Sequence, residues 1–183
     1  GRVEAGIGNF NQRLYKGYYS NGITDNLAYS VSGSINTRDG FTDSLTGLGE
    51  LNDRDRWNLR GQMLYEPTED VTFRLIADYS EIEEVCFTTS RPINGPADGA
   101  IAFLGGQSLN ADDPFSYESV LNFDPVNNVE DSGISLQADI DFDGFTFTSI
   151  TAFRNNESSY LTDVDFTSLD ILTEEARTNI DTF

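Results

Sequence analysis

Apolar and polar side chains alternate along much of the chain, most regularly between Arg56 and Ser80. Two alternating segments, 56–65 and 71–80, flank a polar connection, 66–70, that contains a proline. Successive side chains of a β-strand point to opposite faces, and a short connection with proline is typical of a turn. The sequence therefore predicts an antiparallel hairpin whose strands each have one apolar and one polar face. The apolar rows are Trp57, Leu59, Gly61, Met63 and Tyr65, then Val71, Phe73, Leu75, Ala77 and Tyr79.

The same period continues on both sides of this hairpin. It predicts further strands over 2–8, 12–20, 27–36, 134–142 and 145–153, and an eighth strand over 178–183. Asp143-Gly144 is a strong hairpin signal between two of them. A short helix is expected over 169–176. The predicted fold class is all-β, an antiparallel up-and-down meander of seven or eight strands in one domain that covers residues 1–183.

The connections between these strands alternate in length after the first one. Those at 21–26, 66–70 and 142–144 are short, whereas those at 39–55, 81–131 and 155–177 are long. A meander with its tight turns at one end and its long loops at the other is typical of outer-membrane barrels. A Greek-key sandwich would not be expected to sort its loops in this way. The sequence therefore favours part of a transmembrane β-barrel over a soluble sandwich whose aromatic side chains fill a core.

Aromatic side chains lie near the ends of several apolar rows. Trp57 and Tyr65 are eight residues apart, which corresponds to about 20 Å along the membrane normal for a strand tilted by roughly 40°. This separation is close to the height of a lipid-facing band between two aromatic girdles. The expected girdle residues are Trp57, Tyr65, Phe73, Tyr79, Phe145 and Phe153.

Composition narrows the possible functions. The chain has 183 residues, 31 acidic against 11 basic ones, no histidine and a formal net charge of -20. This charge argues against nucleic-acid binding, which needs a basic surface. No apolar run is long enough for a membrane-spanning helix, and no signal peptide is recognisable. Since the chain opens on a strand-like segment and stops without a terminal signal, we expect a fragment of a longer protein.

With these segments laid out, the sequence resembles a TonB-dependent outer-membrane receptor of the siderophore-receptor-like type, in the part of the barrel just after the plug domain. The matching stretches are VEAGIGNFNQRLYKGYYSNGITDNLAYSVSGSINTRDGF, LNDRDRWNLRGQMLYEPTEDVTFRLIADYSEIEE and DGFTFTSITAFRNN. They cover most of the strand-forming sequence, while the long loop 87–130 matches nothing recognisable. No single motif is diagnostic, but the ordered set is fairly specific.

The resemblance implies a barrel of about 22 strands around a plug. It also implies a place in the bacterial outer membrane and uptake of a scarce nutrient, most often a ferric siderophore, with energy from the TonB complex. The implied partners are outer-membrane lipid, the plug domain, the remaining barrel strands and that complex. Because this chain holds no plug, no TonB box and only seven or eight strands, it cannot transport alone. Family members often carry a cysteine pair near the end of the strand that corresponds to 71–80, but only Cys86 is present here.

Ligand capture is expected in the three long loops, because a rigid scaffold holds them at one end. The aromatic side chains that are candidates for contact with a catecholate or hydroxamate are Phe87, Phe103, Phe115 and Tyr117. Four cations fall on or near polar faces, which fits either a barrel lumen lined with both signs or a solvated surface. These cations are Arg13, Lys16, Arg60 and Arg74.

No cofactor, metal site or enzymatic activity is expected. The segment 139–144 matches the opening of a calcium-binding loop, but its twelfth position holds Ile150 instead of glutamate. The sequence has no histidine to act as a base beside its acidic pairs, no nucleophile elbow, no zinc-ligand spacing and no phosphate-binding glycine loop. The alternative function is that of a secreted or surface β-domain that binds glycans or calcium.

Overall fold

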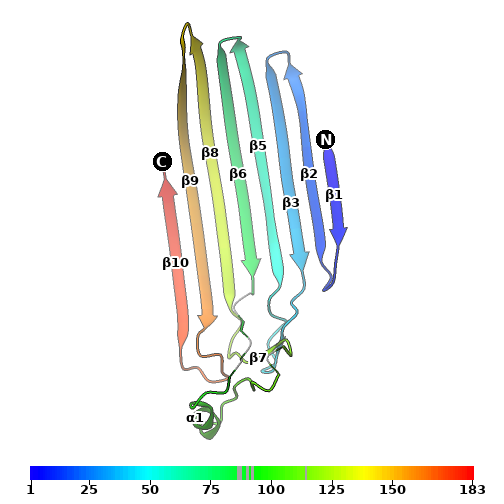
Figure 1. Cartoon of the computed structure of the whole chain (residues 1–183), viewed down its shortest axis with the longest axis vertical. Coiled ribbons are helices and arrows are strands. Elements are labelled where there is room, and N and C mark those ends of the chain that lie inside the picture. The colour runs from blue at the N-terminus through cyan, green and yellow to red at the C-terminus, as the bar shows by residue number, and fades with distance from the viewer. Residues whose placement is uncertain (86–87, 90, 92, 114) are drawn as a thin grey trace.

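The computed structural model describes residues 1–85, 88–89, 91, 93–113 and 115–183. Within these residues the chain is all-β with one short helix, as Figure 1 shows. The long strands are β1 (Arg2–Ile7), β2 (Arg13–Thr24), β3 (Leu27–Arg38), β5 (Arg54–Thr68), β6 (Val71–Glu84), β8 (Val126–Phe142), β9 (Phe145–Asp163) and β10 (Thr173–Thr182). The short elements are β4 (Asp43–Ser44), α1 (Asp98–Phe103) and β7 (Glu118–Ser119). No helix in the described part of the chain is long and apolar enough to cross a membrane.

The eight long strands form one sheet in the order β1-β2-β3-β5-β6-β8-β9-β10. Every neighbouring pair is antiparallel, so the sheet is a simple meander. This confirms the predicted all-β meander of seven or eight strands. The sheet is open, because β1 and β10 lie at its two edges and are not paired with each other. The two short strands β4 and β7 form a separate parallel pair within the long loops.

The connections are sorted between the two ends of the sheet, as Figure 1 shows. The tight turns between β2 and β3, β5 and β6, and β8 and β9 lie at one end, and the long loops lie at the other. This arrangement confirms the predicted separation of the turns at 21–26, 66–70 and 142–144 from the long loops. The first turn, between β1 and β2, is also tight but lies with the long loops, where the Phe10 carbonyl accepts a hydrogen bond from the Asp39 N–H at 2.9 Å.

Cross-strand register places the alternating apolar rows on a single face of the sheet. Val31 pairs with Gly61, Met63 with Leu75, and Leu75 with Leu136. We call this side the apolar face and the other side the polar face. In the described residues no second sheet packs on the apolar face, and Leu59 on it is 51% exposed. Among the residues that the structure describes, the buried aliphatic side chains instead lie in the loops: Leu51, Leu109, Val120 and Leu121.

Several strands are longer than the alternation predicts, and the longest extensions lie at the loop end. Strand β9 continues to Asp163, ten residues beyond Phe153, and β8 begins at Val126. The long loops consequently shorten to 39–53, 85–125 and 164–172. These strand extensions were missed because their side chains are polar on both faces, as in Asn155–Ser159, so no apolar period marks them.

The predicted helix over 169–176 is wrong. Its first half is irregular, and its second half belongs to β10, where Thr173 to Ala176 pair with Asp163 to Tyr160 of β9. Backbone pairing with a neighbouring strand here overrides the helix preference of Glu174, Glu175 and Ala176. The helix that does form, α1, lies in the loop 85–125, for which no regular element was predicted.

Candidate functional site

The three long loops join into one body, which we call the loop cluster (residues 39–53, 85–125 and 164–172). The first and second loops are linked by the β4–β7 pair and by a hydrogen bond from the Asn52 N–H to the Val85 carbonyl at 2.7 Å. The second and third are linked by the Ser168 N–H, which donates to the Gln107 carbonyl at 2.9 Å. Figure 1 shows these segments gathered below one end of the sheet. The loops are therefore held relative to one another by backbone contacts.

A small apolar core lies inside the loop cluster. Leu51 and Leu121 are 0% exposed, and Val120 and Leu109 are also buried. Each such side chain contributes on the order of 1.5–3 kcal/mol when it leaves water. Thr46 reinforces the core, because its hydroxyl donates to the Leu121 carbonyl at 2.6 Å. The loop cluster thus has the packing that the sheet itself lacks.

Asp163 connects the end of β9 to two loops. Its side chain is fully buried, and its Oδ1 accepts hydrogen bonds from the Asp165 N–H at 3.1 Å and the Phe166 N–H at 3.0 Å. Its Oδ2 accepts from the Asn122 N–H at 3.1 Å. Burial raises the pKa of this carboxyl above its ordinary value, against the opposing effect of these backbone donors. Asp163 therefore fixes the loop 85–125 to the beginning of the loop 164–172.

Replacing Asp163 by Asn is expected to loosen the loop cluster. The amide keeps one oxygen for Asp165 and Phe166 but turns an N–H₂ group toward the Asn122 N–H, so a buried donor loses its acceptor. Such a loss costs about 1–3 kcal/mol. Faster amide hydrogen exchange at Asn122 in the folded protein would report it. The control is Asp170→Asn, because Asp170 is exposed and its carboxylate accepts only a long contact from Thr173 at 3.4 Å.

Three aromatic rings from three connections meet on the surface of the loop cluster. The ring of Phe41 lies 5.7 Å from that of Phe10 and 6.0 Å from that of Tyr117, centroid to centroid. The Arg38 guanidinium lies 4.8 Å from the Phe41 centroid. We call Phe10, Phe41 and Tyr117 the aromatic triad.

Of the four predicted contact residues, only Tyr117 belongs to the triad. Phe103 and Phe115 are 90% and 82% exposed, and neither has a described ring contact with Tyr117. Phe87 lies outside the described residues, as does Cys86. The sequence did not identify Phe10 and Phe41 as site residues. Side chains in turns and loops follow no regular apolar period, and nothing in the local sequence indicates which distant residue such a side chain will contact.

The six predicted girdle residues all lie on the apolar face, in two groups. Toward the loop end, Trp57 and Tyr79 have ring centroids 5.1 Å apart, and Phe153 lies in the same direction along β9. The Trp57 N–H donates to Glu81 at 3.0 Å, and the Tyr79 hydroxyl donates to Glu130 at 3.3 Å. The polar tips of both rings therefore point away from the apolar rows and toward carboxylates.

Toward the tight turns, the remaining girdle residues pair across hairpins. The rings of Tyr65 and Phe73 stack with their centroids 6.4 Å apart, and Phe145 stacks on Phe142 at 4.9 Å. Aromatic side chains thus bound the apolar rows at both ends. Girdles of aromatic side chains at both ends of an apolar band are typical of outer-membrane barrel walls.

The polar face carries a charge network across three strands. Arg154 of β9 pairs with Asp131 of β8 and reaches Asp78 of β6 at 2.7 Å. Gly133 lies in register between Asp78 and Arg154, and a Cβ there would stand 3.0 Å from an Arg154 nitrogen. The missing side chain of Gly133 leaves the space through which the guanidinium reaches the more distant strand.

Of the four cations predicted on or near polar faces, three lie on the polar face and one lies on the apolar face. Lys16 pairs with Glu4 at 3.4 Å, and register places Arg60 and Arg74 on the polar face. The prediction that Arg13 lies on or near a polar face is wrong. Arg13 pairs with Ile7 and Thr37 on the side of Tyr15, so it belongs to the apolar face near the loop end.

The segment 139–144, which resembled a calcium loop, is the end of β8 and its turn. Asp139 accepts hydrogen bonds from Gln137 and Thr148, both at 2.7 Å, and Asp141 accepts one from Thr146. These carboxylates serve cross-strand contacts. Across the described residues, no group of three or more acidic or cysteine side chains is arranged to hold a metal ion.

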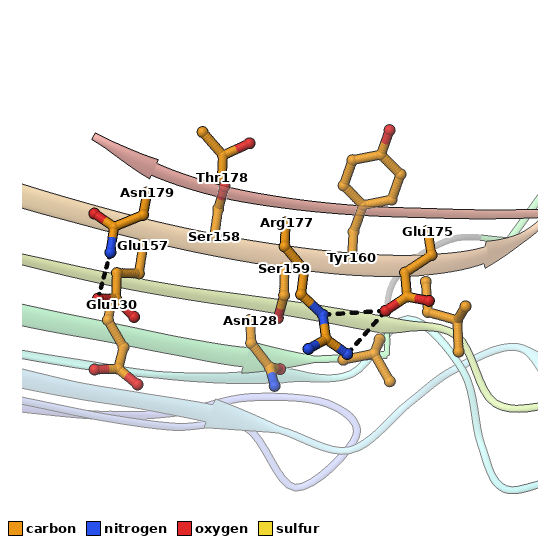
Figure 2. Close-up of a pocket in the computed structure, with 12 residues that line it drawn as sticks. Asn128, Glu130, Glu157, Ser158, Ser159, Tyr160, Glu175, Arg177, Thr178 and Asn179 are labelled. Atoms are coloured by element: carbon orange, nitrogen blue, oxygen red, sulfur yellow. Dashed lines mark hydrogen bonds and ion pairs between the residues drawn. The ribbon is translucent and has the colours of Figure 1, made fainter.

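An open groove of about 530 Å³ lies along the loop-end parts of β8, β9 and β10. Figure 2 shows Glu157 beside Asn179 and Glu175 beside Arg177 in this groove, with Tyr160 and Thr178 projecting to the other side of the strands. Asn179 donates to Glu157 at 2.8 Å, and Arg177 pairs with Glu175 at 2.8 Å. Because these polar groups contact one another at an exposed sheet surface, the groove is less suited to ligand capture than the aromatic triad.

Comparison of the chain with protein-family models, with curated proteins and with solved structures gave no match in any of the three.

Proposed function

We propose that this chain is part of the barrel of a TonB-dependent outer-membrane receptor that imports a small ligand, most often a ferric siderophore in such receptors. In this proposal the chain lies in a bacterial outer membrane with its apolar face against lipid. The plug domain and the remaining barrel strands belong to the same protein, and the TonB complex supplies the energy through the plug. The loop cluster faces the outside and captures the ligand.

The observation that carries the proposal is the uncovered apolar face of a one-layer sheet. Its rows run across at least five neighbouring strands, and Ile35, Leu59 and Ile134 on it are each 51% exposed. Contiguous apolar surface of this extent marks an interaction site, such as a membrane contact. The opposite face is polar and holds ion pairs, which is the alternation of a barrel wall between lipid and lumen.

The aromatic boundaries support the same proposal. Trp57 and Tyr79 point their polar tips toward Glu81 and Glu130, at the level where the apolar rows give way to polar strand extensions. A chemical boundary therefore crosses the strands between the apolar rows and the loop cluster. A membrane interface has the same order of layers, from hydrocarbon through amphipathic rings to charged groups in water.

The alternative, a secreted or surface β-domain that binds glycans or calcium, has less support. It requires a cover over the apolar rows, normally a second sheet about 10 Å away. In the described part of the chain, the only other sheet is the two-residue β4–β7 pair inside the loop cluster. The uncovered apolar face therefore favours the receptor.

Cysteine labelling on cells tests the topology. In a Cys86→Ser background of the full-length protein, Asp112→Cys in the second long loop is expected to react with a membrane-impermeant maleimide on intact cells. Asp143→Cys, in the tight turn between β8 and β9, is expected to react only after the outer membrane is permeabilised. Both positions are exposed in the structure, so accessibility reports the side of the membrane.

Two outcomes of the labelling would contradict the proposal. Equal labelling of both positions on intact cells would mean that the sheet does not span the membrane. Labelling of Asp143→Cys alone would mean that the orientation is inverted. Recovery of the unmodified protein in the soluble fraction of the cell would exclude membrane insertion altogether.

A further inference from the structure

Two of the three rings of the aromatic triad are exposed on a fixed backbone. Phe10 is 55% exposed and Tyr117 is 65% exposed, although both belong to ordered connections. The Phe10 carbonyl is held by the Asp39 N–H at 2.9 Å, and the Tyr117 carbonyl by the Asp43 N–H at 2.8 Å. The three rings thus come from three different segments, with Phe10 and Tyr117 exposed and Phe41 half-buried. Exposed aromatic side chains held in this way are suited to contact a ligand.

The loop cluster, which carries Phe41 and Tyr117, is strongly negative. The three loops of the cluster contain eleven acidic residues and one basic residue, Arg91, a net charge of -10. Arg91 does not offset this field for a ligand, because it already pairs with Asp98. Next to the triad, Asp43 and Glu118 stand opposite each other in the β4–β7 pair. A field of one sign attracts ligands of the opposite charge and repels those of the same charge.

The triad already accommodates one cation. The Arg38 guanidinium lies over the Phe41 ring at 4.8 Å, within the distance of a cation–π interaction. The exposed faces of Phe10 and Tyr117 offer the same attraction to a cation from outside, and the carboxylates around them reinforce it. An anion is attracted neither by the faces of the aromatic rings nor by the carboxylates.

We propose that the aromatic triad binds a cationic organic group of the ligand, such as an ammonium or a guanidinium. The loop cluster then selects cationic ligands over neutral ones and disfavours anionic ones. This inference rests on the proposed transport function and narrows its substrate class, because iron chelates differ in net charge.

A matched series of ligands tests the selection by charge. The probes are three ferric complexes of one linear trihydroxamate, with its terminal amine left free, acetylated or succinylated, so that only the terminal charge changes from positive to neutral to negative. Binding is measured on outer membranes that contain the full-length protein. The amine complex is expected to bind best and the succinyl complex worst, with a difference that shrinks as salt screens the charges.

Two variants separate the triad from general loop effects. Phe10 and Tyr117 have backbone φ angles of 56° and 57°, a region that asparagine adopts more readily than an aromatic residue does. The double variant Phe10→Asn/Tyr117→Asn therefore removes two rings without disturbing the backbone. It is expected to weaken the amine complex by about two- to fivefold per ring. The control Phe142→Leu removes an exposed aromatic ring at the tight-turn end of the sheet, outside the loop cluster, and should leave binding unchanged.

The outcomes distinguish this inference from the transport function. Charge-ordered binding supports the cation site if the double variant weakens the amine complex more than the acetyl complex. This support stands even if energy-dependent iron uptake by cells is absent, a result that would overturn the transport role alone. Binding that does not depend on ligand charge, or that the double variant does not change, overturns the cation site. The transport role still stands in that case if cells take up iron in an energy-dependent way. Failure of all three complexes to bind overturns both.

Discussion

Produced alone in detergent-free buffer, the 183-residue chain is expected to aggregate or to remain largely unfolded. Its sheet is a single layer without a core, and both edge strands, β1 and β10, present unpaired backbone N–H and C=O groups. Open edges of this kind pair with other chains. The apolar face would also meet water, and each side chain left unburied forfeits on the order of 1.5–3 kcal/mol. The net charge of -20 slows association but cannot satisfy the edges.

The measurement is size-exclusion chromatography combined with a thermal melt followed by circular dichroism. The matched control is the full-length protein folded into detergent micelles, where closure removes the edges and detergent covers the apolar face. A monomeric peak with a sharp cooperative melt in plain buffer would contradict this expectation. Such a result would show a self-sufficient soluble domain, and the membrane proposal would fail with it.

The sheet could be predicted from the sequence because the same alternation of apolar and polar side chains repeats in most of its strands. Each strand places apolar side chains such as Leu59 and Leu75 on one face and polar ones such as Asn58 and Arg74 on the other, and this period is local. Neighbour pairing then follows from short connections, since consecutive strands tend to lie side by side. The prediction ended where the apolar face ended, because beyond Phe153 both faces are polar.

The candidate site was less predictable, because it depends on contacts between distant segments. The girdle residues follow from strand parity, so all six fall on one face. The triad brings together Phe10, Phe41 and Tyr117, which are far apart in sequence and lie in connections of different length. Asp163 shows the same limit, because its three backbone donors come from two loops and no local pattern marks it as buried.

The loop cluster and the sheet are stabilised in different ways, and this difference supports a division of roles. Leu51, Val120 and Leu121 are buried inside the loop cluster, so the loops have a packed interior of their own. The sheet is stabilised by backbone hydrogen bonds between its strands, and its apolar face is exposed in this chain. A scaffold of this kind with preorganised loops at one end is suited to binding at that end.

Replacing Leu136 by arginine is expected to destabilise the full-length protein in lipid by about 2–4 kcal/mol, the cost of a basic side chain near the middle of a bilayer. Leu136 pairs directly with Leu75, the middle residue of the apolar row of β6, so it lies between the two aromatic boundaries. The side chain is 44% exposed on the apolar face and would therefore meet hydrocarbon. The measurement is reversible unfolding by denaturant in lipid vesicles, followed by tryptophan fluorescence.

The matched control is Ser135→Arg, one residue away and therefore at the same depth. Ser135 lies on the polar face, paired with Ile76 and Ala152, so an arginine there enters the lumen of the proposed barrel instead of lipid. Lumen substitutions tune the interior without the cost of entering hydrocarbon, and this variant should unfold close to the wild-type midpoint. Equal destabilisation by both arginines would mean that the two faces share one environment, which no membrane-spanning barrel wall allows. A larger cost for Ser135→Arg would place the apolar face in water and the polar face against a partner.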